Sequence, residues 1–139
     1  MKLLLDTNVW IAFFRNPSRW DEFEDRMQRP LLLMSSIVAL ELRAGCITSR
    51  EKRDLAGFLK PFEKAGRVIT PDHASFVEAG RVLAEFKRDG IGVAHRRQIL
   101  NDVLIAVTAI RAGAVVVTAN ANDFLRIEKH TAVRWTQPN

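Results

Sequence analysis

The chain has 139 residues, of which 47% are hydrophobic and 27% are charged, and this balance predicts one globular domain spanning residues 1–139. No segment approaches the roughly 18 consecutive apolar residues of a membrane span, so we expect no membrane partner and a cytoplasmic location. The single cysteine, Cys46, excludes an intramolecular disulfide and a His/Cys zinc centre. The formal net charge of +5 suits a polyanionic partner, although many small proteins carry such a charge for solubility alone.

Short apolar segments alternate with helical patterns along the whole chain, and Gly and Pro separate them. The pattern predicts strands at 2–5, 31–34, 68–70 and 114–117, with a last edge strand at 133–135. It predicts helices at 9–14, 18–27, 37–44, 48–63, 76–89 and 101–112. Because the strands are continuously apolar, we expect a mostly parallel central sheet covered on both faces, which is a three-layer α/β/α sandwich of the α/β class.

Four carboxylates lie at the ends of these apolar segments or within them. They are Asp6, Glu41, Asp102 and Asp123. An unpaired buried carboxylate costs several kcal/mol or takes up a proton, so a group of them indicates a shared partner of positive charge. A divalent metal ion is the obvious candidate.

Each acid also has a simpler local interpretation. Asp6 could cap the helix that follows it, and Asp102 could be an acid that favours the start of a helix. Glu41 could face solvent, and Asp123 could belong to a turn. The carboxyl ends of parallel strands share one edge of a sheet, however, so the chain-distant acids are expected to converge there, with Glu41 projecting from the helix after the second strand.

Four segments carry a recognisable pattern in a recognisable order. They are Leu4–Asn8, Ser36–Gly45 around Glu41, Asn101–Ala106, and the run Thr118–Phe124. These segments resemble the four signature segments of PIN-domain nucleases, and the resemblance covers essentially the whole chain. Among PIN domains, the small single-domain form resembles the VapC toxins of type II toxin–antitoxin pairs.

This resemblance implies a function and a site. Asp6, Glu41, Asp102 and Asp123 would be the catalytic acids that bind Mg²⁺ or Mn²⁺, and Asn8, Thr118 and Asn120 would be supporting polar groups. The implied reaction is hydrolysis of an RNA phosphodiester by a metal-activated water, which requires no protein nucleophile. The implied partners are the RNA substrate, a cognate antitoxin and a second copy of the chain in a homodimer.

Other side chains are candidates for contacts around the site. Arg96 and Arg97 could hold a substrate phosphate, although a solvated turn would explain them equally. The aromatic residues Trp10, Phe13, Phe14 and Trp20 are expected either in the core or on a surface that a dimer partner or an antitoxin covers. The alternatives to a toxin are a housekeeping RNA-processing nuclease of the same fold and a non-catalytic nucleic-acid-binding domain.

Overall fold

The computed structural model describes residues 1–139, with strands and helices alternating along most of the chain. The strands are β1 (Lys2–Leu5), β2 (Leu31–Ser35), β3 (Val68–Ile69), β4 (Val115–Val117) and β5 (Trp135–Thr136). The helices are α1 (Thr7–Arg15), α2 (Pro17–Arg26), α3 (Ser36–Ala44), α4 (Ser49–Lys64), α5 (His73–Arg88), α6 (Val93–Ala112) and α7 (Ala121–Ile127). Every predicted strand is present, with β5 shifted towards the carboxyl terminus. None of the helices combines the length and the apolar character needed to cross a bilayer.

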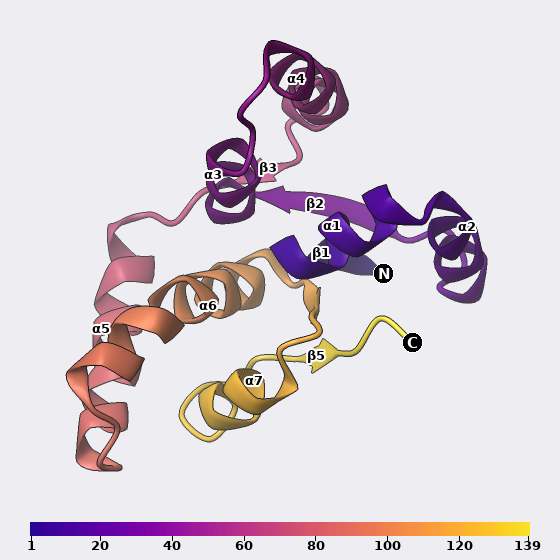
Figure 1. Cartoon of the computed structure of the whole chain (residues 1–139). Helices are drawn as coiled ribbons and strands as arrows, with labels where there is room; N and C mark the ends of the chain where they lie inside the picture. Colours follow the sequence, from indigo (N-terminus) through magenta and orange to yellow (C-terminus); the bar gives the residue numbers. More distant parts are fainter.

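All five strands are parallel and follow the order β3-β2-β1-β4-β5. Helices cover the sheet on both faces, which gives the three-layer α/β/α arrangement expected from the sequence (Figure 1). The central strand explains why the apolar runs are continuous: Leu3, Leu4 and Leu5 are all buried, although their side chains alternate between the two faces.

The strand order reverses at β1. From β1 the chain moves outward through β2 to β3, and it then returns to the other side of β1 to form β4 and β5. Open parallel sheets bind ligands in the crevice at such a reversal, outside the carboxyl ends of the strands. Asp6 follows β1 and Thr118 follows β4, so both residues stand at this crevice.

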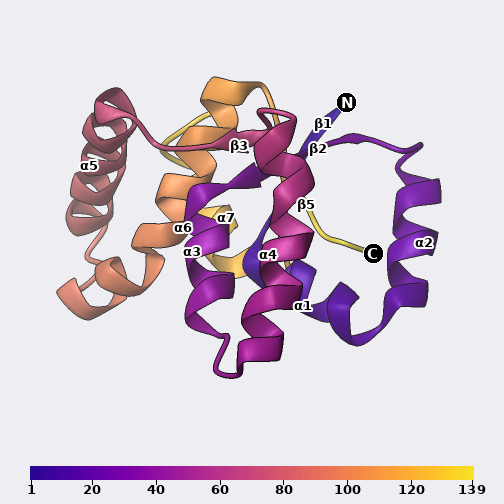
Figure 2. The same cartoon turned by 90° about the horizontal axis from the view of Figure 1, so that it is seen from above.

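The long helices α5 and α6 pack against each other beside the sheet, as both views show (Figures 1 and 2). The central part of α6 is buried from Val103 to Ala109, as its apolar sequence predicts. This helix begins at Val93, however, and not at Asn101. The polar residues at 95–98 interrupt the apolar pattern in its first two turns, and its N-cap residue, Gly92, has no side chain that would indicate a helix start. The prediction that Asp102 opens a helix is therefore wrong, because Asp102 lies in the middle of α6.

The segment after β4 also differs from the prediction. The sequence places Asp123 in a loop, but it lies in the first turn of α7. This helix is short, and its N-cap residue Asn120 makes no side-chain capping bond, so the sequence carries no strong start signal. Phe124 and Ile127 are three residues apart and fully buried, and their packing holds the helix in place.

Helix capping explains several of the other boundaries. Thr48 and Glu51 form the expected capping box at the start of α4. Ser35 caps α3 through the backbone N–H of Ile37. At the other end of α6, Gly113 adopts a left-handed conformation with φ of 68°, which lets the chain turn directly into β4.

The aromatic residues of α1 and α2 form one cluster with those of α4. Trp10 and Phe13 are buried, and Trp10 packs edge-on against Phe58 at a ring-centroid distance of 5.0 Å. Only Phe14 of the four predicted contact residues is strongly exposed. Most of this aromatic surface is therefore used inside the fold, and the part that remains open is a hollow of about 440 Å³ lined by the cluster and by Pro17 and Leu32.

Candidate active site

Asp6 is the most buried of the four acids, with 4% of its surface exposed. It directly follows β1, and its backbone N–H donates to the carbonyl of Val117 on β4 at 2.8 Å. One carboxylate oxygen accepts from the N–H of Thr7 at 2.7 Å, which makes Asp6 the N-cap of α1. The other accepts from the hydroxyl of Thr118 at 2.7 Å. These bonds fix the carboxylate at the point where β1 and β4 end.

Glu41 reaches the same place from α3. The hydroxyl of Thr7 donates to Glu41 Oε1 at 2.8 Å, so Thr7 joins the two acids: its N–H binds Asp6 and its hydroxyl binds Glu41. Glu41 lies one residue before the buried Leu42 and is itself half-buried. The interpretation of Glu41 as an acid that simply faces solvent does not agree with this contact.

Asp102 and Asp123 are joined by a single amide. Asn120 Nδ2 donates to Asp102 Oδ2 at 2.7 Å and to Asp123 Oδ2 at 2.9 Å. The backbone N–H of Asn120 donates to the hydroxyl of Thr118 at 3.0 Å. Because that hydroxyl also donates to Asp6, the chain of bonds Asp6–Thr118–Asn120 connects three of the acids.

The pKa values report how closely these carboxylates interact. Burial, together with the negative charges of Asp6, Asp123 and Glu41, raises the pKa of Asp102 to about 7 against the lowering effect of its hydrogen bond from Asn120. Burial also raises the pKa of Asp6, which its bonds to Thr118 and Thr7 lower and the charge of Glu41 raises. Asp102 thus experiences the negative charges of the other three predicted acids, and Asp6 experiences that of Glu41.

The oxygen atoms at this site can be compared with the ligands that a divalent metal ion prefers. All the available ligands are carboxylate oxygens, with the amide and hydroxyl groups of Asn120 and Thr118 beside them, which is the hard oxygen chemistry that Mg²⁺ and Mn²⁺ prefer. No three acidic, His or Cys side chains approach closely enough to hold one ion together. Mg²⁺ usually takes one or two direct carboxylates and completes its shell with water, so the cluster fits such an ion.

A known protein family matches most of this chain. The family model described as PIN domain matches residues 3–130, a range that contains all four acids. The chain belongs to the PIN-domain family. A relative named tRNA(fMet)-specific endonuclease VapC, from Salmonella typhimurium, is 31% identical over 131 residues, covering 91% of this chain and 92% of the relative. Ribonuclease VapC2 of Rickettsia felis is 28% identical, covering 97% and 98% of the two chains.

Solved structures of similar proteins agree with this assignment. The VapBC-1 structure from nontypeable Haemophilus influenzae superimposes with a TM-score of 0.74 at 25% identity, covering 99% of this chain and 98% of the other. The DNA-bound VapBC structure from Salmonella typhimurium gives a TM-score of 0.72 at 27% identity, covering 100% and 99%. The PIN fold and the resemblance to VapC that the sequence indicated are thereby confirmed.

The supporting polar residues differ in their roles in this PIN domain. Thr118 and Asn120 contact the acids directly, as described above. Asn8 is exposed, and its side-chain oxygen accepts from the N–H of Ala119 at 3.4 Å, so it connects the loops after β1 and β4 without touching an acid. Arg96 donates to the carbonyl of Ile91 and thus ties down the turn before α6, whereas Arg97 is exposed.

Two basic residues that the sequence pattern does not assign to the site lie against Asp123. His95 Nε2 is 3.5 Å from Asp123 Oδ1, and Arg126 Nη1 is 3.9 Å from the same oxygen. Arg126 comes from α7 and is three residues after Asp123, a spacing that would have indicated the contact if α7 had been predicted. His95 lies in the first turn of α6, so its contact with Asp123 could be predicted only if the helix was known to start at Val93.

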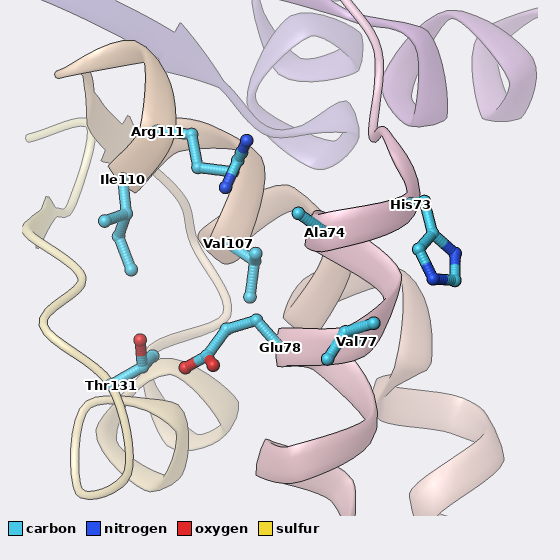
Figure 3. A pocket seen from close by; sticks show the side chains of 8 residues that line it. All are labelled: His73, Ala74, Val77, Glu78, Val107, Ile110, Arg111 and Thr131. Atoms are coloured by element: carbon cyan, nitrogen blue, oxygen red, sulfur yellow. The ribbon is translucent and has the colours of Figure 1, made fainter.

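A second hollow of the PIN domain has a different character. It has a volume of about 480 Å³, lies between α5, α6 and Thr131, and contains none of the four acids. Figure 3 shows Val107 and Ile110 of α6 beside Ala74 and Val77 of α5, with Glu78 extending towards Thr131. Its charged groups have their own partners, since Arg111 binds Asp72 at 3.0 Å and Glu78 binds Arg81 at 2.6 Å. This hollow is therefore not part of the candidate site.

Proposed function

We propose that this chain is a metal-dependent endoribonuclease that acts in the cytoplasm as the toxin of a toxin–antitoxin pair. The observation that carries the proposal is the convergence of four carboxylates, from four separate segments, around an Asp102 whose pKa is raised to about 7. Clustered acids of this kind repel one another, and a bound cation removes that cost. The names of the relatives, which are ribonucleases and a tRNA endonuclease, support RNA as the substrate.

In this proposal Asp6, Glu41, Asp102 and Asp123 hold Mg²⁺ or Mn²⁺, directly and through water. The ion supplies activation of a water molecule and stabilisation of negative charge at the phosphate. Side chains of the protein orient the acids that bind the ion. Thr118 and Thr7 hold the carboxylates of Asp6 and Glu41 in fixed orientations, and Asn120 keeps Asp102 and Asp123 together.

The antitoxin is the second part of the proposal. Solved neighbours are described as VapBC assemblies, which supports a protein partner for this chain. The hollow formed by the aromatic cluster is lined mainly by hydrophobic side chains and borders the exposed Phe14, so it offers a surface for an apolar segment. A basic side chain of the same antitoxin, placed among the four acids, would compete with the metal ion. A homodimer remains our expectation, which light scattering at micromolar concentration tests.

The decisive experiment incubates the purified chain with total cellular RNA in Mg²⁺ or Mn²⁺, in EDTA, and with the product of a neighbouring antitoxin gene. We expect mapped cleavage ends with metal, none in EDTA, and inhibition by the antitoxin. Cleavage that persists in EDTA would overturn metal dependence. Cleavage without any growth effect or antitoxin would favour the RNA-processing enzyme, and RNA binding without cleavage would favour the non-catalytic domain.

A further inference from the structure

A positively charged pocket adjoins the acidic cluster on the far side of Asp123. It has a volume of about 570 Å³ and lies between the turn Gly90–Gly92, the first turn of α6, and the end of α7. The two oxygens of Asp123 face different neighbours. Oδ2 accepts from Asn120, which also binds Asp102, whereas Oδ1 is the oxygen nearest to His95 and Arg126. Two of the residues that line the pocket, His95 and Arg126, therefore lie directly against Asp123.

The cations of this pocket have spare hydrogen-bond donors. Arg126 uses Nη1 to donate to the ring of His95, at 2.8 Å from Nε2, and its nearest carboxylate oxygen is 3.9 Å away. The ammonium group of Lys129 has no partner in the structure. The one acid of the lining, Asp89, is already paired with His130 at 2.5 Å. Arg126 and Lys129 thus leave the pocket with an excess of positive charge and several free N–H groups.

The backbone adds to this charge. The N-cap of α6 is Gly92, which has no side chain to cap the helix, and the N–H groups of Val93, Ala94 and His95 have no acceptor within the protein. Unsatisfied N–H groups at the start of a helix favour a negatively charged ligand. Only one hydrophobic residue, Ile91, lines the pocket. This composition suits a small, strongly charged anion and does not suit an apolar ligand.

We propose that this pocket binds the RNA backbone phosphate next to the phosphodiester that is cut. The inference rests on the proposed ribonuclease function and adds a substrate-positioning site to it. Four clustered acids repel a polyanion wherever a bound metal ion does not neutralise them, so a neighbouring cationic site favours a strand that lies across them. Guanidinium pairs well with phosphate, and the pocket is one side chain away from the acids, where the adjoining part of a bound strand must pass.

The test uses an RNA that the wild-type chain cleaves and measures KM and kcat at several salt concentrations. Lys129→Gln is the first variant because its side chain touches none of the acids. We expect KM to rise roughly fivefold to tenfold with kcat little changed, which is the scale of one solvent-accessible hydrogen bond. The dependence of log KM on log salt should become shallower by about 0.7 for each phosphate of a single strand that the variant no longer neutralises. Arg126→Gln should change KM in the same direction.

Lys60→Gln is the matched control, because Lys60 is exposed on α4 and lies outside the pocket. It removes the same charge and should leave KM and the salt dependence unchanged. Inorganic phosphate should raise KM for the wild type and have less effect on Lys129→Gln. Weaker inhibition of Lys129→Gln by phosphate, together with an unchanged KM for RNA in this variant, would assign the pocket to a free anion and overturn the inference. Equal inhibition of both proteins would place the phosphate outside the pocket and would also overturn it.

The inference and the proposed function fail in different ways. Wild-type cleavage with unaltered KM and salt dependence in both Lys129→Gln and Arg126→Gln overturns the phosphate pocket and leaves the ribonuclease standing. A wild-type chain that cleaves no RNA overturns the proposed function and this inference with it. An equal rise of KM in Lys60→Gln would show a general effect of charge and would also overturn the pocket.

Discussion

Asp72 and Asp102 carry the same side chain, yet their surroundings shift their pKa values in opposite directions. At the exposed start of α5, the N–H and hydroxyl of Ser75 donate to Asp72 and lower its pKa, with Arg111 adding to the effect. In the middle of α6, burial and three neighbouring acids raise the pKa of Asp102 to about 7. The negative charge of Asp72 therefore stabilises the fold, whereas that of Asp102 opposes it. A charge that costs stability has to be explained by function.

Asp6 combines the two situations. It caps α1 through the N–H of Thr7, as Asp72 caps α5 through Ser75, and yet its pKa is raised. The difference is burial, since Asp6 has 4% of its surface exposed and lies near Glu41. Capping alone thus does not account for an acid at this position. The comparison between capping acids and clustered acids leads to four tests.

The largest expected effect is on catalysis. Asp102→Asn should reduce RNA cleavage by about 100-fold or more, because it removes a charge that holds the metal ion in the proposed site. The measurement is the initial rate of cleavage with metal, together with the circular dichroism spectrum as a check of folding. Asp21→Asn, an exposed acid on α2, is the control and should be fully active. Wild-type activity in Asp102→Asn would contradict the proposed site.

The same substitution should stabilise the metal-free fold in a pH-dependent way. The folded pKa of Asp102, about 7, lies above its unfolded value, so the wild type loses stability as pH rises from about 4 through 7. An Asn stays neutral and avoids this loss, and the gain should be on the order of 1–3 kcal/mol at about pH 8. Urea unfolding in EDTA measures it. A gain that does not shrink towards about pH 4 would show that the raised pKa is not its cause.

Metal binding should restore the stability that the fold loses through repulsion among the clustered carboxylates. Millimolar Mg²⁺ or Mn²⁺ should raise the melting temperature of the wild type, because an ion that binds only the folded state stabilises it. The double variant Asp6→Asn/Asp123→Asn should lose this shift, and Asn at position 6 still caps α1. Differential scanning fluorimetry with and without metal gives the comparison. An equal shift in both proteins would place the ion elsewhere.

The smallest effect should come from the capping acid. Asp72→Ala removes the acceptor for Ser75 and should lower the melting temperature by a few degrees while leaving RNA cleavage intact. Because the pKa of Asp72 is lowered, its contribution is present above its unfolded pKa and is lost as pH falls through the folded value. Asp54→Ala, in the middle of α4, should have a weaker effect. A loss of RNA cleavage in Asp72→Ala would contradict the distinction between the capping acid Asp72 and the clustered acids of the candidate site.

The sequence was sufficient to predict the parallel sheet and to predict which four acids come together at its edge. Continuous apolar runs such as Leu3–Leu5 identify buried parallel strands, and acids beside such runs are few enough to single out. The positions of these acids within helices were harder to predict, because Gly92 and Asn120 start α6 and α7 without a capping side chain. The positions of His95 and Arg126 beside Asp123 were not predicted for the same reason. Their contact with Asp123 depends on where those helices begin.

Because Asp123 lies in α7, the four acids cannot come together until α7 has been synthesised. A ribosome makes Asp6 long before Asp123, and the Val117 carbonyl that binds the Asp6 N–H is also made after β1 to β3. A nascent chain that has released only β1 to β3 therefore has neither β4 beside β1 nor the fourth acid. The cluster is assembled only after α7 has been made, so the order of synthesis would delay the proposed activity in a cell whose own RNA is the proposed substrate.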